Sequence, residues 1–176
     1  MTKFVKIAAV AAAVLATTPA LAAPVGVTPG SEPQASARII KPLTLTATGS
    51  MNFGTIVIPA GGVTANRTIS LDTAGAVTPA NCGRGNAEVV CSGTTSVPTY
   101  NVKGTNNQVV TVHKNASTLT GNNGGTLQLT PTGPNSVALP NSGTGGTNFT
   151  VGGDIVIAPA TVDGLYTGTV DVTVEY

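Results

Sequence analysis

The sequence predicts an all-β protein, an antiparallel β-sandwich with an immunoglobulin-like layout. Short segments of alternating apolar and polar residues recur at a spacing of roughly 8–12 residues, with Gly, Pro and Asn between them. The 176 residues include 22 Gly and 12 Pro, which favour turns, and many Thr and Val, which favour strands. No segment of ten or more residues after the first 22 has the period of an amphipathic helix.

The first 22 residues have the pattern of a secretory signal peptide. Lys3 and Lys6 give a positive start, residues 7–16 form an apolar run, and Ala20 and Ala22 are the small residues of a cleavage site. The run is too short to span a membrane, and no later segment is long enough, so we expect no span in the mature chain. Removal of 22 residues from 176 leaves 154, the size of one domain.

Residues 23–36 are predicted to be a flexible N-terminal leader, because three Pro, two Gly and small polar residues bury little surface. A single sandwich domain is expected from 37 to 176. Its first strand candidate spans residues 37–47, and Lys41 interrupts the apolar face of that segment. The apolar face consists of Ala37, Ile39, Leu43, Leu45 and Ala47.

The middle of the chain contains further strand candidates with turn residues between them. They are residues 51–59, 67–71, 87–91, 98–104, 108–114, 125–131 and 147–159. We expect a bend at Gly54 and another at Gly152-Gly153. Residues 105–107 are predicted to be a hairpin turn between two strands, and residues 133–146 a long loop.

Cys82 and Cys91 are the two cysteines of the sequence, and in an exported protein such a pair is expected to form a disulfide. A structural metal site would need more ligands than these thiols and His113, the single histidine, provide. We therefore predict no metal and no cofactor.

Charge and motifs exclude several functions. Eight Lys and Arg stand against seven Asp and Glu, and loss of Lys3 and Lys6 with the signal leaves six against seven, a net charge of −1. With only 9% charged residues, a nucleic-acid partner is not expected. No Ser-His-Asp, Cys-His or phosphate-loop pattern is present, so we predict that the protein is not an enzyme.

The last thirteen residues, 164–176, alternate almost without interruption. One face carries Gly164, Tyr166, Gly168, Val170, Val172, Val174 and Tyr176, and the other is mostly Thr, Asp and Glu. A period of two over this length predicts a half-buried strand with the Val face inward.

This segment resembles the C-terminal strand of chaperone–usher pilus subunits, which combines a Gly about a dozen residues from the end, alternating apolar residues and a terminal or penultimate Tyr. The segments NFG (52–54), YNVKG (100–104) and NFTVGG (148–153), with 164–176, are also similar to an uncharacterised family of secreted bacterial domains. That family is often regarded as pilin-like.

The pilin resemblance implies a sandwich that lacks one strand, so that the C-terminal strand borders an open apolar groove. A periplasmic chaperone would fill the groove first, and the N-terminal extension of another subunit, delivered at an outer-membrane usher, would replace it by β-strand addition. Partners would then be copies of the chain or related subunits, and the destination would be the cell surface. The two cysteines, close in sequence, depart from the widely spaced pair common in pilins.

Two interpretations of residues 37–47 remain open at this point. The segment is either a donor strand for another subunit or the first strand of a complete sandwich. As a donor strand it would carry the charged Lys41 side chain on its inward face, where burial of the charge is unfavourable. The first interpretation predicts a structural subunit of a fimbria or surface fibre. The alternative is a self-contained secreted or surface β-sandwich that binds a ligand.

Overall fold

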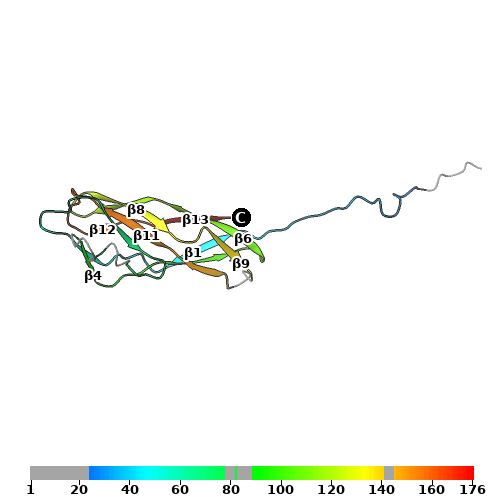
Figure 1. Ribbon diagram of the computed structural model, residues 1–176. Coiled ribbons are helices and arrows are strands. Elements are labelled where there is room, and N and C mark those ends of the chain that lie inside the picture. Colours follow the sequence, from blue (N-terminus) through cyan, green and yellow to red (C-terminus); the bar gives the residue numbers. More distant parts are fainter. Residues whose placement is uncertain (1–23, 78–81, 83–88, 141–144) are drawn as a thin grey trace, which may run out of the picture. The chain divides into compact units, whose positions relative to one another are not determined.

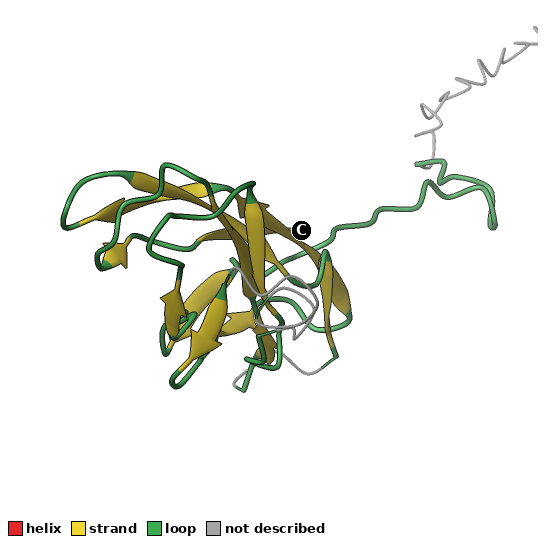
Figure 2. Ribbon diagram, turned by 60° about the vertical axis from the view of Figure 1, so that its left-hand side comes forward, coloured by secondary structure: helices red, strands yellow, loops and turns green. Residues whose placement is uncertain are grey.

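The computed structural model describes residues 24–77, 82, 89–140 and 145–176. The predicted signal peptide lies outside these ranges. The described residues form strands and loops and contain no helix, which confirms the all-β prediction (Figures 1 and 2). The strands are β1 Thr44–Thr48, β2 Thr55–Val57, β3 Arg67–Leu71, β4 Val90–Ser92, β5 Thr99–Lys103, β6 Gln108–Asn115, β7 Ser117–Gly121, β8 Thr126–Thr132, β9 Ser136–Leu139, β10 Thr147–Thr150, β11 Gly152–Ile157, β12 Tyr166–Thr167 and β13 Asp171–Glu175.

The chain divides into two compact units, residues 1–38 and 39–176. The described part of the first unit, residues 24–38, is exposed throughout and contains no strand. It contains one turn, in which the Ser31 N–H donates to the Thr28 carbonyl at 2.9 Å. All thirteen strands of the described residues belong to the second unit.

The strands of the second unit pair antiparallel in four sheets. Their orders are β1-β5-β10, β12-β7-β8-β11-β3, β13-β6-β9 and β2-β4. β6 and β7 follow each other directly along the chain, and β13 pairs with β6 while β12 pairs with β7. The C-terminal strand therefore lies along the whole of residues 111–121.

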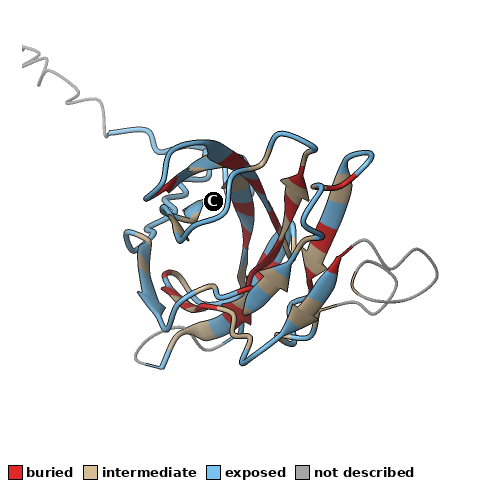
Figure 3. Cartoon of the chain, turned by 90° about the vertical axis from the view of Figure 1, so that its left-hand side faces the viewer, coloured by how far each residue is buried: buried red, intermediate tan, exposed pale blue. Residues whose placement is uncertain are grey.

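The apolar side chains of these sheets form two buried clusters. The strand positions that are buried are coloured red on the chain in Figure 3. One lies between β5 and β10 on one side and β6 and β9 on the other, and includes the stacked rings of Tyr100 and Phe149, whose centroids are 5.4 Å apart. The other is formed by β3, β8 and β11 together with Phe53 and Val63. Sheets that face each other across a shared apolar core make this unit a β-sandwich.

The alternation in the sequence explains which side chains enter the core. In β8, Leu127, Leu129 and Pro131 are buried, while the Thr and Gln residues between them are exposed. Because neighbouring residues of a strand point to opposite faces, this pattern fixes one face of the sheet towards the core. The predictions at 67–71, 98–104, 108–114 and 125–131 are confirmed as β3, β5, β6 and β8.

The predicted hairpin at residues 105–107 is wrong. β5 pairs with β1 and β10, whereas β6 pairs with β13 and β9, so the turn connects strands of different sheets. Its polar groups bond to distant segments: the Asn107 N–H donates to the Leu139 carbonyl at 2.7 Å. Short polar connections of this kind occur both in hairpins and between sheets, and the local sequence does not separate the two.

The structure differs from the sequence prediction in three other places. Residues 133–146 are not one long loop, because β9 lies within them and pairs with β6. Strand β7 was not predicted, since its run of Thr, Ser and Gly has little apolar character. The segment 147–159 does break near the glycines, but at Val151, and its halves β10 and β11 belong to different sheets. The predicted bend at Gly54 is confirmed by its φ of 75°.

Neighbouring valines of β6 provide a test of this core. Val110 is fully buried and Val109 is 62% exposed. We expect Val110→Ala to lower the free energy of unfolding by about 2 kcal/mol, because two buried methyl groups are lost and a small cavity remains. Val109→Ala, the matched control, should change it by less than about 0.5 kcal/mol. Urea unfolding measures both, and equal effects would contradict the assignment of the core face.

Candidate functional site: a groove beside the C-terminal strand

The C-terminal strand is an edge strand with a partly covered apolar face. Val170, Val172 and Val174 are half-buried, and Asp171, Thr173 and Glu175 are exposed, as the alternation predicts. Among the described residues, β13 is paired on one side by β6 and β12 on one side by β7. The other edge of this strand is therefore without a strand partner in the described part of the chain.

The beginning of the C-terminal strand is fixed by the loop between β7 and β8. Asn122 accepts the Leu165 N–H through its side-chain oxygen at 2.7 Å, and its own N–H donates to the Leu165 carbonyl at 3.0 Å. The Tyr166 hydroxyl donates to the Val162 carbonyl at 2.7 Å. These bonds hold the strand at the point where it leaves the preceding loop.

The end of the strand is fixed by a second hydroxyl. The Tyr176 hydroxyl donates to the Lys41 carbonyl at 2.6 Å and accepts the Thr105 N–H at 2.7 Å. The Thr105 hydroxyl oxygen accepts the Lys41 N–H at 2.6 Å. We call Lys41, Thr105 and Tyr176 the clasp. Sequence reasoning placed Tyr176 in an assembly strand but missed this role and both of its partners.

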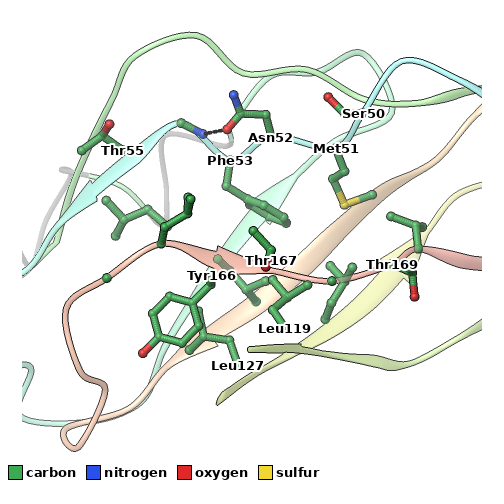
Figure 4. Close-up of a pocket in the computed structure, with 18 of the residues that line it drawn as sticks. Ser50, Met51, Asn52, Phe53, Thr55, Leu119, Leu127, Tyr166, Thr167 and Thr169 are labelled. Atoms are coloured by element: carbon green, nitrogen blue, oxygen red, sulfur yellow. Dashed lines mark hydrogen bonds between the residues drawn. The ribbon is translucent and has the colours of Figure 1, made fainter. Parts of the chain in front are cut away.

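An open cavity of about 790 Å³ lies beside the C-terminal strand. We call it the groove. Its first wall is residues 47–58, its second wall is residues 161–170, and between them core side chains form the floor. Met51 and Phe53 project from the first wall towards the floor residues Leu119 and Leu127 (Figure 4). The remaining floor residues are Leu129, Ile155 and Ile157.

The two walls line the groove with consecutive residues. On the second wall every residue from Thr161 to Val170 takes part, and on the first every residue from Gly49 to Ile56. The first wall consists of the end of β1, a loop and β2, which pairs with β4. The second wall includes β12, which pairs on one side only, with β7. The groove therefore runs along a free edge of the C-terminal strand, above an apolar floor.

The groove carries little charge. Asp163 is the one charged side chain among the described residues that line it. Tyr100 also reaches the lining, and burial, followed by the negative charge of Asp171, raises the pKa of its hydroxyl above the ordinary value of 10.0. The phenol stays neutral at physiological pH, and apart from Asp163 the described lining carries no charged side chain.

The candidate donor strand, residues 37–47, is divided by the structure. Leu45 and Ala47 lie in β1, which pairs with β5 of the same chain, and Leu43 packs against the core cluster of β5 and β6. For these three residues the interpretation as a first strand of the sandwich is correct. Ala37 and Ile39 lie before β1, and both are exposed.

The remaining residues singled out in the sequence are the two cysteines and the single histidine. Cys82 and Cys91 form the predicted disulfide, with Cα atoms 5.4 Å apart. His113 is on the surface, where its Nε2 lies 2.9 Å from the Glu175 carboxylate. Among the residues that the structure describes, no three His, Cys, Asp or Glu side chains gather as a possible metal site, and no helix has the length and apolar character to cross a membrane.

The fold and groove define a class: an all-β sandwich in which the free edge of the C-terminal strand borders a groove with an apolar floor. Residues 43–176 match the model of the domain of unknown function DUF4402, and the chain belongs to this family. The search of curated proteins gave no match, and the search of solved structures gave none either. The resemblance to an uncharacterised domain family is thereby confirmed.

Gly168 offers a test of the second wall. A Cβ at this position would lie 2.7 Å from Leu119 Cδ2 and 2.8 Å from the Thr118 carbonyl oxygen, so the strand approaches β7 too closely for a side chain. We expect Gly168→Ala to destabilise the fold by about 1–3 kcal/mol through overpacking. Gly61→Ala is the control, because a Cβ there meets nothing within 4 Å. The midpoint temperature of thermal unfolding is measured for both variants. A midpoint for Gly168→Ala equal to that of the wild-type chain would contradict this packing.

Proposed function

We propose that this protein is a structural subunit of a fimbria or surface fibre, assembled by β-strand addition between copies of the chain. The observation that carries the proposal is the groove, whose second wall includes the free edge of the C-terminal strand and whose floor is apolar. An extended peptide fits such a site, because its backbone bonds to the free edge and alternate side chains cover the floor.

The occupant that we propose is the N-terminal segment of a second copy, residues 32–40. Its nine residues are about 30 Å long when extended, close to the length of the ten-residue edge from Tyr166 to Glu175. Ala35, Ala37 and Ile39 alternate with Ser36 and Arg38, as a strand with one apolar face requires. Ile39 is 90% exposed, so its side chain is accessible to a second copy.

This choice of segment also answers the difficulty raised by Lys41. Both backbone groups of Lys41 are bound in the clasp of its own chain. The inserted part would thus end before Lys41, at Ile39 or Ile40, and the charged side chain would stay outside the groove. The donor strand proposed from the sequence accordingly moves towards the N-terminus and keeps Ala37 and Ile39.

Assembly through this segment has consequences for partners and location. Identical head-to-tail contacts do not close on themselves, so they produce a fibre. Before assembly the open groove would be an aggregation hazard, and a periplasmic chaperone followed by an outer-membrane usher would protect it. The disulfide fits passage through an oxidising compartment such as the periplasm. The fibre would stand on the cell surface.

A second candidate function has one observation in its favour. The volume of the groove, about 790 Å³, lies within the range of pockets that hold small molecules. A self-contained module would bind an apolar ligand there and remain a monomer. The two functions therefore differ in the oligomeric state of the purified protein.

Two adjacent isoleucines of the segment test the proposal. Ile39 is predicted to face the floor of another copy, and Ile40, 51% exposed, to face away from it. In cells that express the full chain, Ile39→Asp should abolish polymers, because a carboxylate in an apolar groove costs several kcal/mol. Ile40→Asp, the same change one residue further, should preserve them. Polymers are detected as an antibody-stained ladder of sheared material on SDS gels, unboiled beside boiled.

The pattern of bands separates the outcomes. A wild-type ladder that collapses on boiling, is lost in Ile39→Asp and persists in Ile40→Asp supports the proposal. A single monomer band from the wild-type chain in both lanes would remove the fibre and favour the ligand-binding module. A ladder that survives both substitutions would move the donor strand to another segment.

A further inference from the structure

The clasp holds both backbone groups of Lys41, the residue that connects the N-terminal segment to the sandwich. Its carbonyl accepts from the Tyr176 hydroxyl and its N–H donates to the Thr105 hydroxyl oxygen, each at 2.6 Å. The partners are 135 and 64 positions away in the sequence. Lys41 is exposed, so this fixation does not come from burial of its side chain.

The surroundings of the clasp are shaped for the tyrosine. A Cβ at Gly104 would lie 2.5 Å from the Tyr176 hydroxyl oxygen and 2.7 Å from Leu43 Cδ2. The absence of a side chain at 104 thus makes the space in which the hydroxyl reaches Lys41. A tyrosine that only covered the core would not need its hydroxyl in this position.

The two walls of the groove run in opposite directions. The first wall leads away from the clasp, from Ala47 to Ile58, and the second leads towards it, from Thr161 to Val170. In the close-up, Thr55 lies near the Tyr166 end of the second wall and Ser50 near the Thr169 end (Figure 4). Lys41 precedes the first wall and Tyr176 follows the second, so the clasp lies beyond the end of the groove that Ala47 and Val170 form.

The N-terminal segment could enter its own groove by one route, as a hairpin with β1. The chain would have to reverse direction within Lys41, Pro42 and Leu43. Pro42 has a fixed φ and no N–H, and it keeps Lys41 extended. Tight hairpin turns need positive φ angles, which these residues do not favour. The reversal would also break both bonds of Lys41 in the clasp.

We propose that the clasp keeps the N-terminal segment out of its own groove, so that the segment is committed to another copy. This inference rests on the proposed function, and it assigns to the Tyr176 hydroxyl a role that the strand pattern does not require. Tyr176 is a positioning residue here: it acts through Lys41 on the direction in which the segment leaves the sandwich. We call a monomer whose N-terminal segment fills its own groove self-closed. Without the clasp, self-closed monomers would compete with polymers.

The test is the removal of single hydroxyl groups from the full chain, expressed in cells and analysed in sheared and periplasmic fractions. Tyr176→Phe should raise the ratio of self-closed monomer to polymer about tenfold, the factor for about 1.4 kcal/mol or one net hydrogen bond. Thr105→Val, which removes the acceptor for the Lys41 N–H, should act in the same direction. Thr95→Val is the matched control, because its hydroxyl donates to the Gly75 carbonyl at 2.6 Å and belongs neither to the clasp nor to the groove lining.

Trypsin identifies the self-closed form. Arg38 is exposed, and cleavage after it should be rapid in wild-type and Thr95→Val monomers. In the self-closed monomer of Tyr176→Phe the same bond would lie in a paired strand and resist cleavage. Unfolding curves of the variants distinguish this protection from a general change in stability, and Thr105→Val supplies the result if Tyr176→Phe does not fold.

The outcomes separate the two proposals. A wild-type ladder with unchanged ratios and unchanged Arg38 cleavage in Tyr176→Phe and Thr105→Val would overturn the role of the clasp and leave the fibre intact. A wild-type chain that forms no ladder would overturn the proposed function and this inference with it. Equal effects of Thr95→Val and Tyr176→Phe would show that the general stability of the fold, and not the clasp, controls closure, and would overturn the inference.

Discussion

The backbone N–H and C=O groups at the edge of a β-strand need hydrogen-bond partners. The proposed assembly of the second unit depends on this requirement. The C-terminal strand pairs on one side only, with β6 and β7. Its other edge borders a groove whose floor is formed by leucine and isoleucine side chains. Water can satisfy the edge groups, but it meets an apolar floor at the same place. An incoming strand removes both unfavourable surfaces at once, which makes the groove a stronger binding site than the strand edge alone.

The groove keeps its form because both walls are anchored outside it. The second wall is held at Leu165 by Asn122 and at Tyr176 by the clasp, while Gly168 packs tightly against β7. The first wall continues from β1, whose five residues all pair with β5. A site held in this way loses little conformational freedom when it is filled, so more of the interaction energy appears as affinity.

The described part of the N-terminal segment has the opposite character. Residues 24–42 are all exposed, and they include the isoleucines at 39 and 40 and the valines at 25 and 27. Proline, glycine and small polar residues give such a segment little reason to fold alone. Its ordering would accompany binding, and the apolar groove offers the surface that its alternating residues need. The anchored groove and the exposed N-terminal segment are thus complementary parts of the proposed assembly.

Local patterns in the sequence determined the fold class, most strands, the two faces of the C-terminal strand and the disulfide pair, because residues close in the chain fix them through the strand period and turn chemistry. The tertiary structure decided which strands pair. It separated β5 from β6, revealed β9, and placed Leu45 and Ala47 in the sandwich itself. It also created the first wall and the clasp, in which Tyr176 meets Lys41 across 135 positions. Alternation gives the face of a strand but not its neighbour, because the same pattern suits any apolar partner, within the chain or beyond it.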